Sequence, residues 1–131
     1  MKDIQLKGTK ITELSFINKL ENNSQITIGN KYSYNVRYAP NNICVGEFTA
    51  ELADSQKPDK FLIKLTYAGI FSYPESMARD AIHLKTYDML FPYVRAAITD
   101  LTASAGIPPI YIPYIDISGE EIYSIKFPTK A

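Results

Sequence analysis

The side chains best suited to catalysis or metal binding are scarce in this chain, which has one cysteine, Cys44, and one histidine, His83. A zinc site needs several Cys, His or carboxylate ligands at defined spacing, so the sequence excludes one. A Ser or Cys nucleophile needs a base near it, and His83 is the only histidine available. We expect His83 to be a packed or surface side chain and Cys44 to be a small buried hydrophobe.

Two carboxylates, Glu47 and Glu51, project from one face of a predicted strand and come nearest to an acid–base pair. Four residues of strand separate them by about 13 Å, which is too far for joint work on one bond. The six scattered glycines form no phosphate-binding loop. The sequence therefore predicts a protein that is not an enzyme and uses no metal or other cofactor.

Aromatic side chains are abundant, with ten Tyr and six Phe against no Trp. They either cover the core or line an adaptable groove for extended apolar polypeptide, because Tyr and Phe offer broad contact area at small entropy cost. The residues predicted to line such a groove are Tyr32, Tyr34, Tyr38, Ile110, Tyr111, Ile112 and Tyr114.

Length and composition indicate one globular domain, residues 1–131, of 14.8 kDa. Fourteen Lys and Arg balance fourteen Asp and Glu, which argues against a surface that tracks nucleic-acid phosphates. No segment approaches the roughly 18–20 apolar residues of a membrane span, and residues 1–6 lack the apolar run of a signal peptide. We expect a cytoplasmic protein with no membrane insertion and no nucleic-acid partner.

Alternation of polar and apolar residues predicts an antiparallel sheet of about four strands in the first half of the chain. The predicted strands lie near residues 4–16, 32–38, 44–52 and 61–68. The first has a break in phase before Leu14, and residues 19–30 form a long connection. Turn formers at 40–42 and 54–59 join the last three strands in a meander. Gly46 marks a bulge or a close backbone approach.

The period then changes, and Ser72-Tyr73-Pro74-Glu75 fits a capping box at the start of a helix. The helix is predicted to run to Ala105 and to end at Gly106. Pro92 removes an interior hydrogen bond, so we expect a kink or break near residues 89–91. The apolar residues before Pro92 spread around the helix axis, which predicts burial against a partner chain.

Prolines at 108, 109 and 113 predict an extended segment laid along the body after the helix. Residues 120–126 fit either a short strand or one helical turn.

Two stretches resemble the SecB family of export chaperones. Residues 61–72, Phe-Leu-Ile-Lys-Leu-Thr-Tyr-Ala-Gly-Ile-Phe-Ser, are similar to the family's last strand, which ends Gly-Gly-Ile-Phe-Ser. Residues 90–98, Leu-Phe-Pro-Tyr-Val-Arg-Ala-Ala-Ile, resemble its Leu-Phe-Pro-Tyr-Ala-Arg helix motif. With residues 9–16 and Pro108-Pro109-Ile110, the resemblance covers residues 4 to 116.

The resemblance implies an α+β fold in which a long Pro-broken helix packs on one side of a four-stranded antiparallel sheet. It also implies a homotetramer, a dimer of dimers, that holds unfolded clients in grooves without nucleotide. The grooves would be lined by the first connection and by the segment after the helix. The open sheet face, with Glu13, Leu62 and Lys64, would dock a SecA-type motor. The residues expected at the oligomer interface are Ile63, Leu65, Tyr67, Met77, Ile82, Leu84 and Met89.

The chain also departs from the family's pattern. Lys64 stands where the family carries a Glu for the motor, Ile17 occupies a similar acidic position, and Glu13 keeps the acidic sign. We expect the family's basic motor-binding tail to be absent and its lid helix to be reduced to what residues 117–131 can form.

These features predict an ATP-independent holdase that binds unfolded or partner polypeptides in a hydrophobic groove, in protein export. A narrower alternative is a dedicated chaperone of one partner, as in toxin–antitoxin systems that carry a SecB-like chaperone, and the altered open face favours it slightly. A further alternative is an oligomeric interaction protein that has lost client holding. An enzyme of the hot-dog type is disfavoured, because that fold places its helix after the first strand.

Overall fold

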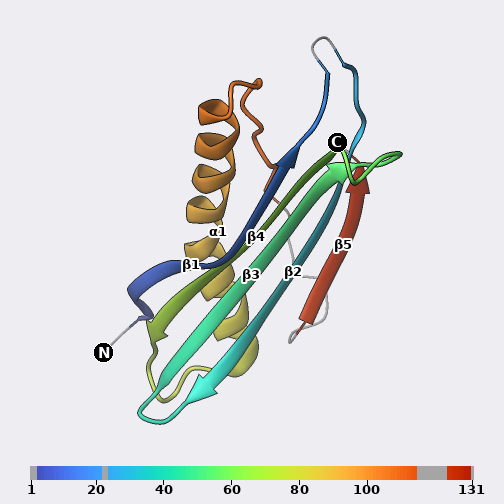
Figure 1. Ribbon diagram of the computed structural model, residues 1–131. Coiled ribbons are helices and arrows are strands. Elements are labelled where there is room, and N and C mark those ends of the chain that lie inside the picture. The colour runs from blue at the N-terminus through green and yellow to red at the C-terminus, as the bar shows by residue number, and fades with distance from the viewer. Residues whose placement is uncertain (1–2, 22–23, 115–123, 131) are drawn as a thin grey trace.

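The computed structural model describes residues 3–21, 24–114 and 124–130, the last of these as backbone. In that part of the chain, five antiparallel strands form one sheet, and a helix crosses one face of it (Figure 1). The order across the sheet is β1-β4-β3-β2-β5. The elements are β1 (Gln5–Asn18), β2 (Ile28–Ala39), β3 (Ile43–Asp54), β4 (Phe61–Ser72), α1 (Arg79–Ser104) and β5 (Ser124–Lys130).

The predicted four-stranded antiparallel sheet with a long helix on one side is confirmed by β1 to β4 and α1. The fifth strand, β5, pairs with the outer edge of β2 from Gly29 to Asn35. Residues 124–126, for which the sequence left strand and helical turn open, are therefore strand. The remainder of the expected lid, residues 117–123 and 131, lies outside the described residues.

The meander of β2, β3 and β4 follows the predicted turns. Asn41 and Asn42, in the hairpin between β2 and β3, have φ of 68° and 58°. Asn tolerates this left-handed conformation because its short polar side chain forms local hydrogen bonds. The phase break in β1 is also confirmed, because its register against β4 shifts between Leu6 and Gly8 and again between Ile11 and Glu13. Such bulges place residues on either side of them on different faces of the sheet.

The helix begins later than the capping box predicted. Ser72 is the last residue of β4, where it pairs with Gln5 and Ile43, so it is not available as a cap. The cap position is Ala78, which makes no side-chain hydrogen bond to the helix. Strand pairing on both sides of Ser72 therefore prevails over the local capping signal.

Pro92 does not break the helix, which runs as one element from Arg79 to Ser104. Leu90, Phe91 and Val94, which surround the proline, are all buried in the core. Their burial holds the backbone helical past a residue that lacks an N–H donor. The helix ends as predicted at Gly106, whose φ is 83°.

The core lies between α1 and the sheet, mainly over β3 and β4. Along β3 every second residue is buried, with Phe48, Ala50 and Leu52 facing α1. The buried residues of α1 lie on one face along the length of the helix. They are Ile82, His83, Thr86, Tyr87, Leu90, Phe91, Val94, Ile98 and Thr102. The first half of the helix therefore has one buried face. The apolar residues alone did not predict it, because the polar residues His83 and Thr86 form part of that face.

Gly46 of β3 and Gly69 of β4 lie opposite each other beneath α1. A methyl group at Gly46 would lie 3.0 Å from Cζ of Tyr34 and closer still to its hydroxyl. At Gly69 it would lie 3.0 Å from Cδ1 of Leu90. The predicted close approach at Gly46 is therefore made by a side chain, that of Tyr34.

We predict that Gly46→Ala lowers the free energy of unfolding by about 1–3 kcal/mol, because the Tyr34 ring must shift to admit the methyl group. Urea denaturation followed by circular dichroism measures this. Gly8→Ala is the matched control, since nothing lies within 4 Å of a methyl group there. Equal losses in the two variants would contradict the assigned packing.

Candidate functional site

A cluster of aromatic rings extends from the core of the sheet towards the surface. Phe48 stacks on Tyr87 at 5.6 Å between ring centroids and lies 5.9 Å from Phe91. Tyr34 packs edge-on against Tyr87 at 5.3 Å. Tyr114, half of whose surface is exposed, continues the cluster at 5.4 Å from Phe91. The aromatic cluster thus reaches solvent and is formed by rings from β2, β3, α1 and the segment after α1.

Polar groups inside this cluster are held in uncharged forms. The Tyr34 hydroxyl donates to Oγ1 of Thr86 at 2.5 Å, and Thr86 donates to the carbonyl of Ile82 at 2.8 Å. Burial raises the pKa of Tyr34 and raises that of Tyr32 to about 12. Burial lowers the pKa of His83, whose side chain is inaccessible to solvent, so its ring is neutral at pH 7.

Cys44 is fully buried, and burial raises the pKa of its thiol to about 11. A thiol with that pKa is protonated at neutral pH and is a poor nucleophile. In the described residues, no three His, Cys, Asp or Glu side chains converge to hold a metal ion. The cluster thus offers apolar contact and hydrogen bonding.

The chain turns back along α1 after the helix ends. Gly106 N–H donates to the carbonyl of Ala103 and Ile107 N–H to that of Thr102, which is the Schellman arrangement. Residues 107–114, which we call the strap, then run back beside the helix on the side of the sheet away from the viewer (Figure 1). The predicted extended segment laid along the body is confirmed.

Side chains of α1 bind the backbone of the strap. Thr99 Oγ1 donates to the carbonyl of Ile110 at 2.8 Å, and the amide of Ile110 donates to Oγ1 of Thr102 at 2.9 Å. Nε of Arg95 donates to the carbonyl of Ile112 at 3.0 Å. The spacing of these three residues, Arg95, Thr99 and Thr102, places them on one side of the helix, which we call the α1 stripe.

The far end of the strap is fixed by its side chain. The Tyr114 hydroxyl donates to Oδ1 of Asp88 at 2.5 Å. The guanidinium carbon of Arg95 lies 4.9 Å from the centroid of the Phe91 ring. The strap therefore contacts α1 over four turns, from Thr102 back to Asp88.

The predicted groove residues fall into three groups by burial. Tyr32, Tyr34 and Ile112 have 2% or less of their surface exposed, so they lie in the core of the single chain rather than on its surface. Tyr38 and Ile110 are partly buried. Tyr111 and Tyr114 are exposed by 70% and 49%.

Sequence reasoning missed the helix side of this site. Phe91, Arg95, Thr99 and Thr102 recur at three- and four-residue intervals, a signal that marks one helix face. Polar side chains at residues 95, 99 and 102 predict a helix face exposed to solvent. In the structure the strap covers this face.

The residues predicted at the oligomer interface differ in how far the single chain buries them. Ile63, Leu65 and Ile82 have 2% or less exposed surface, because α1 and the sheet of the same chain bury them. Tyr67, Met77, Leu84 and Met89 are partly buried against the same core. Apart from the tyrosines of the strap, the large apolar side chains that the described residues leave exposed on the helix side lie on β1 and α1. They are Ile11, Leu14 and Tyr93, at 43–48%.

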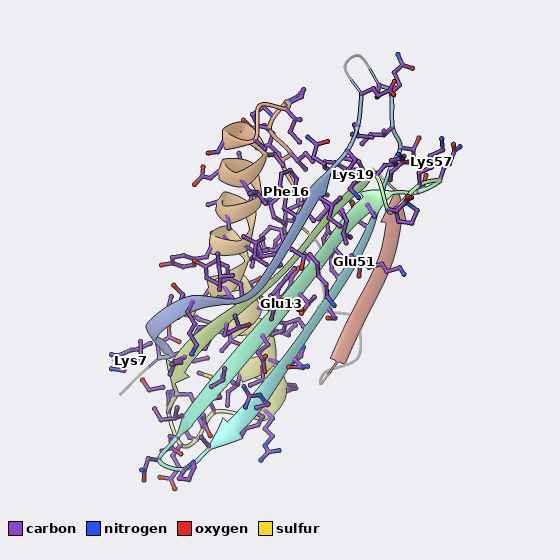
Figure 2. All side chains as sticks on the ribbon, in the orientation of Figure 1. Lys7, Glu13, Phe16, Lys19, Glu51 and Lys57 are labelled. Atoms are coloured by element: carbon purple, nitrogen blue, oxygen red, sulfur yellow. The ribbon has the colours of Figure 1, made fainter. Side chains whose placement is uncertain are left out.

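The sheet face opposite α1 carries charged and polar side chains. Figure 2 views this face, with Glu13 of β1 and Glu51 of β3 labelled. Nζ of Lys64 lies 3.9 Å from Oε1 of Glu13, and Nε of Arg37 lies 2.7 Å from Oε1 of Glu47. Leu62, next but one to Lys64 on β4, is partly buried on this face. The predicted open face thus brings Glu13 and Lys64 together as an exposed pair, which contributes little to stability.

The 26 residues of α1 fall short of the hydropathy that a membrane-crossing helix needs, and α1 is the sole helix in the described ranges.

Comparison with known proteins gives a family match over most of the chain. Residues 11–126 match the family described as SecB, preprotein translocase subunit SecB. The protein-export protein SecB of Anaplasma marginale (strain Florida) is 38% identical over 65 residues, or 47% of this chain and 37% of that protein. That of Methylocella silvestris is 39% identical over 61 residues, or 44% of this chain and 38% of that protein. The matches thus span less than two fifths of these relatives' length.

A solved structure has the same fold. It is a SecB-like chaperone of Mycobacterium tuberculosis, in complex with a ChAD peptide from the HigA1 antitoxin. The TM-score is 0.69 at 15% sequence identity, and the match covers 86% of this chain and 91% of that chain. At this identity the likeness shows the fold.

Proposed function

The chain belongs to the SecB family, and we propose that it is an ATP-independent holdase, which binds unfolded polypeptides and keeps them from aggregating. The observation that carries the proposal is the aromatic cluster that reaches solvent at Tyr114. Aromatic surface of this kind removes a client's apolar side chains from water without demanding one sequence.

Nothing in this mechanism requires turnover. Client binding and release are governed by buried apolar area and by the client's own folding, so the protein is not an enzyme on this proposal and needs no cofactor. The families and relatives matched are translocase subunits and export proteins, which supports a role in the cytoplasm, ahead of export.

A second candidate function is that of a chaperone dedicated to one partner. The SecB-like chaperone of M. tuberculosis is in complex with an antitoxin peptide, which supports such a role for this fold. The ion pair of Lys64 with Glu13 also supports it, because the pair offsets the acidic charge expected to attract a SecA-type motor. Docking of that motor on Glu13, Leu62 and Lys64 stays a prediction.

The homotetramer, a dimer of dimers, is part of the proposal as well. Its interface residues must be accessible in the single chain, which favours Ile11, Leu14 and Tyr93 over the buried Ile63 and Leu65. Sizing by multi-angle light scattering measures the assembly directly.

The experiment that tests the holdase function is light scattering of a chemically unfolded model protein during dilution, with and without this protein. We expect suppression of aggregation at a near-stoichiometric ratio, unchanged by ATP. Ile70→Ser is a control variant. Ile70 is exposed on the face opposite α1, so we expect its replacement to leave the suppression of aggregation unchanged.

No suppression by a folded, correctly sized protein would rule out general client holding. Binding of one partner polypeptide alone would then identify the dedicated chaperone. Absence of any polypeptide binding would leave an oligomeric interaction protein.

A further inference from the structure

The hydrogen bonds between α1 and the strap use atoms that every polypeptide has. Thr99, Thr102 and Arg95 contact the carbonyl of Ile110, the amide of Ile110 and the carbonyl of Ile112. None of these three bonds involves a side chain of the strap. The α1 stripe therefore has donors and acceptors placed for the backbone of an extended segment of any sequence.

The side chains of the strap alternate between the core and solvent. Ile110 is partly buried and Ile112 is 2% exposed, whereas Tyr111 between them is 70% exposed. Alternation of this kind is how an extended chain presents every second side chain to one surface. The stripe thus receives two branched apolar side chains and then the aromatic ring of Tyr114.

The strap is held to the body without a strand ladder. Residues 107–114 are neither helix nor strand, and the prolines at 108, 109 and 113 carry no N–H donor. Beyond the backbone bond of Ile107, the strap is held through side chains, and a segment held in this way detaches at a much lower free energy than the global unfolding of the sheet and helix. Phe91, Arg95 and Thr99 would remain on the rigid helix after detachment.

We propose that the strap is an internal occupant of the client site, and that client segments bind the α1 stripe in its place. The client is an extended polypeptide with apolar side chains at alternate positions, running antiparallel to α1 as the strap does. Two residues beyond the second apolar position it carries a tyrosine or a basic side chain, because the Asp88 carboxylate accepts a hydrogen bond there. This inference rests on the holdase function proposed above.

Competition between strap and client sets the apparent affinity. A client binds only the fraction of molecules whose strap is detached, so its apparent Kd is the intrinsic Kd divided by that fraction. Weakening the strap without touching the helix should therefore strengthen client binding. A strap that served as a wall of the groove would give the opposite sign.

The test compares three strap variants in one titration. The probes are reduced, carboxymethylated α-lactalbumin, which is permanently unfolded, and a fluorescein-labelled peptide with the sequence of residues 107–114. Ile112→Ala removes a buried anchor, and Tyr114→Phe removes only the hydroxyl that donates to Asp88. Tyr111→Ala, on the outer side of the strap, is the matched control.

We expect Kd for both probes to fall roughly three- to ten-fold in Tyr114→Phe, at least as far in Ile112→Ala, and to stay unchanged in Tyr111→Ala. Circular dichroism verifies the fold, and Tyr114→Phe decides the matter alone if Ile112→Ala unfolds. Weaker binding by Tyr111→Ala, with no tightening in Tyr114→Phe, would show that clients bind on the outside of the strap and would overturn the inference while the holdase function stands. If no variant and no wild-type protein binds α-lactalbumin, the proposed function fails and the inference with it.

Discussion

Replacing Leu65 with Asp is expected to unfold the protein. Leu65 lies on the α1 side of β4, between Leu14 of β1 and Ala50 of β3, with 2% of its surface exposed. A carboxylate there has no described cation on its face to pair with, and an unpaired buried charge costs about 3–5 kcal/mol in addition to the lost apolar burial. That sum is comparable with the roughly 5–15 kcal/mol that stabilises a domain of this kind.

Circular dichroism and a urea titration of Leu65→Asp measure the effect. Leu62→Asp is the matched control, because it makes the same change three residues away on the opposite, partly exposed face of the same strand. We expect Leu62→Asp to stay folded. A place for Leu65 at the oligomer interface, as the family resemblance implies, would instead give a folded Leu65→Asp protein that dissociates into smaller species. A Leu65→Asp variant with a native spectrum and a reduced mass would restore Leu65 to the interface.

The second large effect is expected for Phe48→Ala. The Phe48 ring is 1% exposed and lies within 6.3 Å of four other aromatic rings. Removing it deletes the centre of the aromatic cluster and leaves a cavity beneath α1. We expect the free energy of unfolding to fall by about 3–5 kcal/mol.

Phe16→Ala is the matched control for Phe48→Ala. Phe16 is only partly buried, and its one ring contact in the described part of the chain is with Phe61 at 6.2 Å. Guanidinium denaturation of both variants should therefore give a clearly smaller loss for Phe16→Ala. A similar loss in both would mean that the cluster around Phe48 adds nothing beyond ordinary burial.

Local signals in the sequence were sufficient to predict those elements whose conformation depends on neighbouring residues in the chain. The alternation along β3 and β4, the turn at Asn41 and Asn42 and the end of the helix at Gly106 all follow from side-chain period or from φ preferences. The start of the helix did not follow, because Ser72 is also a strand residue and its pairing with Gln5 is invisible from the local sequence.

The sequence by itself determined that the chain is an antiparallel sheet with one long helix, that it has one histidine and one cysteine, and which side of each strand is apolar. Only the tertiary structure decided what covers those apolar sides. Ile63 and Leu65 are buried by the chain's own helix, and Thr99 and Arg95 receive the backbone of residues 110 and 112. The reason is physical: a two-residue or 3.6-residue period records that a face is shielded from water, whereas the identity of the shielding atoms depends on contacts between segments far apart in the chain.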